Sequence, residues 1–288
     1  MKANFTIKHN TDLNWKMVKG HFHDGYEILL SLSEGCNFFI NKDTYHLKKG
    51  SLVFISEGTL HHSFAKEGTS YERYVLHVPA GTLRNLSSEQ TNFVTTFKEL
   101  NCCIDLGEAP TEHIRWLCEN CLQHDGNRFG EDLRRITAFS EMLLYFCELL
   151  EQKKYVLPQK SAEFARVAPI IDHIIQFIDE HVAEPLPLEL LATHFSINKY
   201  YLCHLFKEAT GFTVVEYMNN RRVLKACALL RQGANVRKAA EDSGFASSAH
   251  FIRIFRKLCG TTPGQYAKSH KNQHNQVSLA VDKYPPYL

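Results

Sequence analysis

Two segments near the carboxyl end of this chain share one layout: a short apolar helix, a tight turn and a second helix with a polar outer face. They span residues 186–210 and 235–259. In each segment the apolar residues recur at helical spacing, which predicts that one face of each helix is buried and the opposite face is exposed. This duplicated pattern predicts two helix-turn-helix units within one all-α domain.

The second helix of the first unit follows Asn198, whose side-chain oxygen can accept a hydrogen bond from a free backbone N–H one turn on. Helical spacing places Leu202, Leu205 and Phe206 on the inner face. The polar outer face then consists of Lys199, Tyr200, Cys203, His204 and Lys207.

The second unit has its turn at residues 243–245, and its second helix carries Phe251, Ile254 and Phe255 on the inner face. With Ala246 at the usual capping position, we expect this helix to start from Ser247. Its outward residues are Ser247, Ser248, Ala249, Ile252, Arg253, Arg256 and Lys257.

A long apolar-patterned helix over residues 214–230 separates the two units and spans roughly 25 Å at ~1.5 Å per residue. Two outward helices held this far apart suit successive turns of a DNA major groove. Arg253 is the best candidate for a bidentate contact to guanine, because a guanidinium matches the O6/N7 acceptor pair. Arg256 and Lys257 are expected to meet phosphate, and Arg221 and Arg222 could grip the DNA backbone.

Residues 186–267 resemble the DNA-binding domain of the AraC/XylS family of bacterial transcription regulators. The resemblance rests on Leu202-Cys203-His204-Leu205-Phe206-Lys207, on Thr210-Gly211-Phe212, and on Gly260-Thr261-Thr262-Pro263-Gly264-Gln265-Tyr266. It implies a sequence-specific regulator, most often an activator, that binds promoter DNA, contacts RNA polymerase and works as a homodimer. Cys203 and His204 replace the long polar residues usual in the family, so base recognition by the first unit is expected to be weak.

Length and charge agree with a two-part regulator. A chain of 288 residues is long enough for two domains that each bury a core. Residues 164–288 carry 15 Lys and Arg against 10 Asp and Glu, so the basic excess lies where the repeat lies. No apolar run could cross a bilayer, and nine cysteines without regular spacing suit reduced thiols, so we expect a cytoplasmic protein.

The amino-terminal part alternates in the manner of short strands separated by turns. The clearest strands are residues 27–32, 36–40, 45–47, 52–55 and 74–78, with turns at 41–43 and 49–50. Several short strands at this spacing predict a small β-barrel.

A histidine-rich run, His21-Phe22-His23-Asp24-Gly25-Tyr26-Glu27, precedes Gly50, Gly58 and His61. This pattern resembles the two cupin motifs, with Ser56 where the second motif normally has proline. The resemblance offers His21, His23, Glu27 and His61 as ligands for a divalent transition metal such as Zn, Ni, Mn or Fe. The same side chains could instead hydrogen-bond a polar ligand, so no cofactor is assigned at this point.

We expect the barrel interior to bind a small-molecule effector, a sugar or related metabolite by analogy with the family. Such sites combine aromatic faces with a few polar groups. The candidate effector-binding residues are His21, His23, Tyr26, Glu27, Phe38, Phe54, His61, Tyr74 and His77.

Residues 110–155 are predicted to be helical. Their broad apolar stripe, made of Leu133, Ile136, Phe139, Met142, Leu143, Phe146 and Leu150, could cover the barrel alone or also pair two subunits. His113, Cys118, Cys121 and His124 fall on one helix, and beside Leu117 and Leu122 they are better explained as a buried helical face than as a metal or redox site.

The predicted fold is therefore an α+β multidomain protein. It has a cupin-like β-barrel sensor domain (residues 1–100), a helical packing or dimerisation segment (101–155), a linker (156–166), a double helix-turn-helix domain (167–268) and a flexible tail (269–288). We predict a ligand-responsive transcription regulator rather than an enzyme. The alternatives are a metal-dependent cupin enzyme fused to a DNA-binding domain, and a constitutive regulator whose barrel only dimerises.

Overall fold

The computed structural model describes residues 4–269 except 16, 18–19, 66, 99, 125–127, 153–154 and 158–161. The chain divides into two compact units, residues 1–168 with 209–211 and residues 169–208 with 212–288. Of the linker predicted at 156–166, residues 158–161 lie outside this description, as does the predicted tail from residue 270 onward. Helix α5 (Ala162–Glu180) begins five residues before the expected start at Val167.

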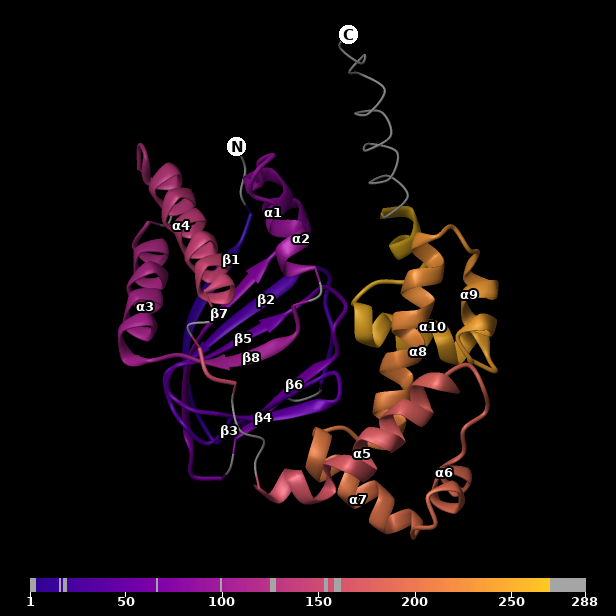
Figure 1. The fold of residues 1–288 in the computed structure, drawn as a ribbon. Helices are drawn as coiled ribbons and strands as arrows, with labels where there is room; N and C mark the ends of the chain where they lie inside the picture. The colour runs from indigo at the N-terminus through magenta and orange to yellow at the C-terminus, as the bar shows by residue number, and fades with distance from the viewer. Residues whose placement is uncertain are drawn as a thin grey trace. The chain divides into compact units, whose positions relative to one another are not determined.

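Two antiparallel sheets build the first unit (Figure 1). The five-stranded sheet has the order β1 (Thr6–Leu13), β7 (Ser70–Val78), β2 (Tyr26–Ser31), β5 (Ser51–Ile55), β8 (Cys102–Asp105). The three-stranded sheet has the order β4 (Asp43–Leu47), β3 (Cys36–Ile40), β6 (His61–Ala65). The sequence predicted β2, β3, β4, β5 and β7 but not β1, β6 or β8.

Strand β2 is buried along its whole length because both faces of its sheet are covered. One face packs Leu29, with Val53 and Ile55 of β5, against the three-stranded sheet. The other face packs Ile28 and Leu30 against helices. Successive side chains of a strand point to opposite faces, so neighbouring β2 residues belong to two different cores.

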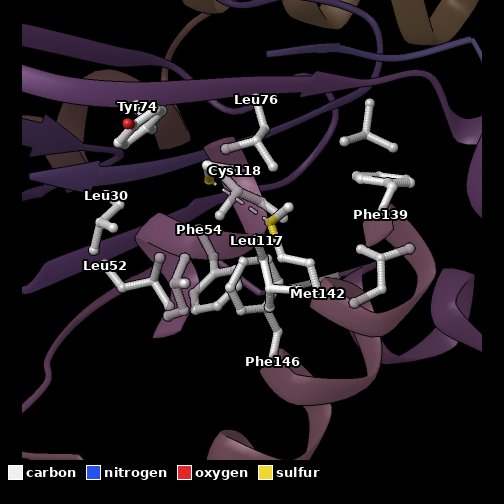
Figure 2. Packing of buried hydrophobic residues seen from close by; sticks show 14 of the residues in the cluster. Leu30, Leu52, Phe54, Tyr74, Leu76, Leu117, Cys118, Phe139, Met142 and Phe146 are labelled. Carbon is white, nitrogen blue, oxygen red and sulfur yellow. Dashed lines mark hydrogen bonds between the residues drawn. The ribbon is translucent and has the colours of Figure 1, made fainter. Parts of the chain in front are cut away.

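Helices α3 (Glu108–Gln123) and α4 (Glu131–Glu151) lie side by side over the five-stranded sheet (Figure 1). Figure 2 shows how Phe139, Met142 and Phe146 of α4 meet strand residues such as Phe54. The apolar stripe predicted on α4 is buried in its centre, but Leu133 at its start is 63% exposed. Helices α1 (Ala80–Leu86) and α2 (Phe93–Phe97) complete this cover.

Cys118 and Cys121 lie within this core, as the sequence predicted. The Cys118 thiol contacts the Met142 sulfur at 3.9 Å. Burial raises the pKa of the Cys121 thiol to about 12. A thiol with so high a pKa stays protonated and is a poor metal ligand or nucleophile, so the two cysteines contribute apolar packing.

The second unit contains α5, α6 (Leu188–His194), α7 (Lys199–Thr210), α8 (Val214–Arg231), α9 (Val236–Asp242) and α10 (Ser248–Cys259), and a further helical segment follows at 263–269. The two helix-turn-helix pairs are α6–α7 and α9–α10, and α8 connects them (Figure 1). A capping box between Thr213 and Glu216 starts α8. Along α8, Val214 is buried whereas Val215 is 47% exposed.

Gly244 forms the turn between α9 and α10 and has φ +86°, a left-handed conformation that glycine adopts at little cost. A Cβ atom there would lie 2.7 Å from the Val182 carbonyl oxygen and 2.8 Å from Ala183 Cα. The glycine therefore serves two needs, the sharp turn and the close approach of this turn to the chain that follows α5.

Candidate functional sites

His21, His23, Glu27 and His61 converge in the first unit, with one potential ligand atom of each within 4.8 Å of the others. We call these four residues the His–Glu cluster. Glu27 and His61 are buried, whereas His21 and His23 are partly exposed. The cluster therefore has a buried side and a side nearer to solvent.

The four side chains meet through backbone pairing and a turn. His21 forms an isolated bridge with His61, in which each backbone N–H donates to the other residue's carbonyl at 3.0 Å. Gly25, with φ +102°, then turns the chain into β2, and a Cβ there would lie 2.9 Å from the Val78 carbonyl oxygen. This turn brings His23 close to Glu27.

Three imidazoles surround one carboxylate oxygen. Oε2 of Glu27 lies 3.0 Å from His23 Nε2, 3.0 Å from His77 Nε2 and 3.7 Å from His61 Nε2. Burial raises the pKa of the Glu27 carboxyl, but hydrogen bonds from the imidazoles of His23 and His77 outweigh it and hold this pKa well below its usual range. The cluster thus contains a buried carboxylate anion.

The predicted effector residues divide between the two faces of the five-stranded sheet. Glu27 pairs with Ile55 and His77 across β2, β5 and β7, so these three side chains share the inner face. Phe38, on the facing sheet, stacks parallel to His61 with ring centroids 6.1 Å apart. His77 and Phe38 therefore lie near the His–Glu cluster.

Tyr26, Phe54 and Tyr74 lie instead on the opposite face, within the core under α3 and α4. Phe54 packs edge-on against Phe146, and the Tyr74 hydroxyl donates to Glu119 at 3.3 Å. They lie on the other side of the sheet from the His–Glu cluster because each differs by an odd number of residues from the inward-facing position on its own strand. Only residues an even number of positions from Glu27, Ile55 or His77 on the same strand share the inner face, and none of these three aromatic residues does.

Helix α7 presents the predicted outer face of the first helix-turn-helix unit. Asn198 accepts a hydrogen bond from the backbone N–H of Tyr200 at 2.8 Å, and Leu202, Leu205 and Phe206 are buried, as the sequence predicted. Tyr200 is 78% exposed, while Cys203 is only half-buried. His204 and Lys207 are exposed, and Lys199 forms an ion pair with Glu189 at 2.8 Å.

Helix α10 presents the outer face of the second unit. Ser247 caps it, accepting from the backbone N–H of His250, which confirms the predicted start. The outward side chains are exposed, namely Ser248, Ala249, Ile252, Arg253, Arg256 and Lys257. Phe251, Ile254 and Phe255 are buried beneath them. Neither recognition helix is covered by the described part of its own unit.

Arg222 was predicted to grip the DNA backbone, but its guanidinium bonds two carbonyl oxygens of its own unit. Its Nε donates to the Val182 carbonyl at 2.9 Å and its Nη2 to the Glu184 carbonyl at 2.8 Å. Burial lowers the pKa of this guanidinium. Arg221 likewise bonds Asp179 at 2.6 Å. Both arginines tie α8 to the end of α5 and the chain after it, a role that sequence spacing could not reveal.

Tyr201, which the sequence did not single out, is 53% exposed next to Tyr200 on α7. Its position three residues before His204 places both on one helix flank. An exposed aromatic ring on a polar helix face was the available signal. Tyr201 therefore joins the residues that can contact a partner.

A buried polar cluster in a β-domain and two exposed recognition helices in one chain are typical of a ligand-responsive, sequence-specific DNA-binding regulator. The model for the AraC-like ligand binding domain matches residues 2–154, and that for a helix-turn-helix domain matches residues 191–269. The chain belongs to the AraC/XylS family of transcription regulators. It is a regulator and not an enzyme, so the cupin-enzyme alternative is set aside.

Several relatives resemble this chain over different lengths. The regulatory protein SoxS of Salmonella typhimurium is 36% identical over 34% of this chain and 92% of its own. The transcriptional activator RhaS of Escherichia fergusonii is 25% identical over 84% of this chain and 85% of its own. A solved structure of ToxT from Vibrio cholerae covers 92% of this chain and 97% of its own at 15% identity, with a TM-score of 0.41. Among the described residues, no helix has the length and apolarity needed to cross a membrane.

Proposed function

We propose that the first unit senses a small polar metabolite of the sugar class at the His–Glu cluster. The observation that carries this proposal is a buried carboxylate ringed by imidazoles, with His77 43% exposed at its solvent side. Carboxylate and imidazole groups can accept from and donate to the hydroxyl groups of a sugar. Phe38 adds an aromatic ring near the same polar groups, a combination common in small-molecule sites.

Thermal shift of the full chain against a panel of sugars tests this proposal. A sugar at about 100 times its Kd should stabilise the unit that binds it by about 2.7 kcal/mol, since it binds only the folded state. Glu27→Gln should abolish the shift, whereas His46→Ala, which changes an exposed histidine bonded to Asn37, should retain it. A panel without any shift, or a shift retained in Glu27→Gln, would contradict the assignment of this site.

We propose that the regulated step is activation of transcription through RNA polymerase at promoters bound by α7 and α10. The relative RhaS is described as an activator, and both recognition helices expose their polar faces. Such a protein acts where promoter DNA is, which in a bacterium is the cytoplasm. Mapping the bound promoter fragments, followed by transcription in vitro with and without the effector, would show activation as more transcript. Less transcript would identify a repressor.

We further propose that the protein is a homodimer assembled through α3 and α4. Trp116 of α3 is 52% exposed and Leu144 of α4 is 46% exposed. The His113 ring lies 4.6 Å from that of Tyr145 and 6.1 Å from that of Trp116, so aromatic groups extend across the seam between the helices. Large apolar side chains exposed together are typical of protein interfaces.

Light scattering of the purified chain tests the dimer. The double variant Trp116→Asp with Leu144→Asp should have the mass of a single chain, because two buried carboxylates oppose association. Leu13→Asp, which changes a still more exposed leucine on β1, should leave the mass of the dimer unchanged. A dimer that persists in the double variant would exclude this surface.

A further inference from the structure

One imidazole nitrogen in the His–Glu cluster lacks the partner that its burial requires. Nε2 of His61 is fully buried and has no hydrogen-bond partner among the residues that the structure describes. A buried polar atom without a partner is costly, and such atoms in folded proteins often mark the place of a bound water molecule or ion. The identity of this missing partner follows from the other nitrogen of the ring.

The proton of the His61 ring is fixed by the backbone. Nδ1 of His61 lies 2.9 Å from the carbonyl oxygen of Thr59. A carbonyl oxygen only accepts, so Nδ1 carries the hydrogen and donates it. In the neutral ring, Nε2 then presents its lone pair to the cluster. A histidine whose Nδ1–H donates to a backbone carbonyl is oriented as metal-binding histidines usually are.

The lone pair of His61 faces the carboxylate oxygens of Glu27. Nε2 lies 3.7 Å from Oε2 of Glu27, which is beyond hydrogen-bonding distance, and the Glu27 side chain is 5% exposed. A lone pair and a buried carboxylate repel each other unless a cation lies between them. Burial removes the water that would otherwise separate these groups.

The remaining members of the cluster supply further ligand atoms around the same position. The rings of His21 and His61 have centroids 4.5 Å apart, and those of His23 and His61 are 5.1 Å apart. The four ligand atoms lie within 4.8 Å of one another. Ligands about 2.0–2.1 Å from a metal sit roughly 3.3 Å apart in a tetrahedron and about 4.2 Å apart across an octahedron, so the widest ligand pair must approach by about 0.6 Å to lie across an octahedron and by about 1.5 Å to fit a tetrahedron.

We propose that His21, His23, Glu27 and His61 bind one divalent transition-metal ion, with His77 as a positioning residue that holds the Glu27 carboxylate. Three imidazoles and one carboxylate favour Zn, Ni, Co, Fe or Mn over Mg or Ca, which prefer oxygen ligands. This inference deepens the proposed sensing function, since it names the ion through which a polar effector meets the cluster.

Cobalt(II) is a suitable probe because its visible absorption reports the ligands around it. The full-length chain, stripped with EDTA and dialysed, should bind about one Co²⁺ per chain and develop absorption bands stronger than those of the aqueous ion. Elemental analysis of the loaded chain after gel filtration gives the stoichiometry independently of the spectrum.

Matched variants locate the ion. His23→Ala and Glu27→Gln should weaken Co²⁺ binding by more than ~100-fold, and His77→Ala by about 10-fold, since outer-shell partners of metal ligands contribute roughly 10–100-fold. His46→Ala, outside the cluster, should bind as the unaltered chain does. Circular dichroism shows whether each variant is folded, and His21→Ala replaces any variant that is not.

Either of two results would overturn the proposal. One is a folded chain that binds no Co²⁺ or Zn²⁺. The other is metal binding with the same affinity and spectrum in His23→Ala, Glu27→Gln and His21→Ala. A sugar-induced thermal shift in the metal-free chain would still support the sensing function, so failure of the two proposals can be told apart.

Discussion

The two units position their functional side chains by different means. In the second unit, the residues that face outward are neighbours in sequence, and a cap at the start of each recognition helix sets the phase of its outer face. In the first unit, the His–Glu cluster and His77 come from segments that lie far apart along the chain, from His21 to His77. The helical surface therefore depends on local geometry, while the cluster depends on how two sheets pack.

The largest expected effect tests whether the first unit can be destabilised independently of the second. Phe139 is fully buried and stacks on Phe5 with centroids 3.9 Å apart. Phe139→Ala should destabilise the first unit by about 3–5 kcal/mol, because it leaves a cavity under α4. Phe129→Ala, which changes a fully exposed ring, should change stability by less than about 0.5 kcal/mol. Calorimetry should show one transition lowered, and an unchanged melting profile would contradict the assigned core.

The corresponding change in the second unit is Gly244→Ala. The added Cβ meets backbone atoms of Val182 and Ala183 in a left-handed conformation, so we expect a loss of roughly 2–4 kcal/mol. Gly233→Ala is a matched control, because Gly233 has φ +93° but nothing within 4 Å of its Cβ position, and should cost only about 1 kcal/mol. Equal losses in the two variants, measured by urea unfolding, would show that the close approach contributes nothing.

Arg253 and Lys257 should separate base recognition from charge attraction on α10. Arg253→Ala should relax the preference at one base position by ~1–3 kcal/mol. Lys257→Ala should weaken binding to all sequences alike and reduce the slope of log K against log salt by about 1. Binding titrations at several salt concentrations on matched operator and mutant fragments measure both. If sequence preference were unchanged in Arg253→Ala, its role in base recognition would be lost.

The smallest expected effect concerns the cap of α10. Ser247→Ala removes the side-chain oxygen that accepts from the His250 N–H, at a cost of about 1 kcal/mol. Ser248→Ala, one residue on, removes a hydroxyl that the cap does not use and should have little effect. Urea unfolding of the two variants compares them directly, and similar stabilities would mean that the long 3.5 Å contact contributes little.

The contrast also explains what the sequence could predict. Capping residues and helical spacing located α7 and α10 and their buried residues, because these signals act over four or five residues. The cupin-like pattern named all four cluster residues. The contacts of Arg222 could not be predicted, since its carbonyl partners lie about 40 residues away in sequence. The sequence did not separate Tyr26, Phe54 and Tyr74 from the residues near the cluster, since an aromatic residue fits either face of a sheet that is covered on both sides.

Strand β2 carries Glu27 of the His–Glu cluster on one face and packs against the core under α3 and α4 on the other. Glu27 faces the histidines, while Tyr26 and Ile28, one peptide unit away on either side, press against the core beneath α3 and α4. A ligand that shifted the Glu27 backbone would displace both adjoining side chains within a close-packed layer, which responds to small displacements by repacking. A ligand bound on one face of this strand would then act on the packing of the other face without a hinge.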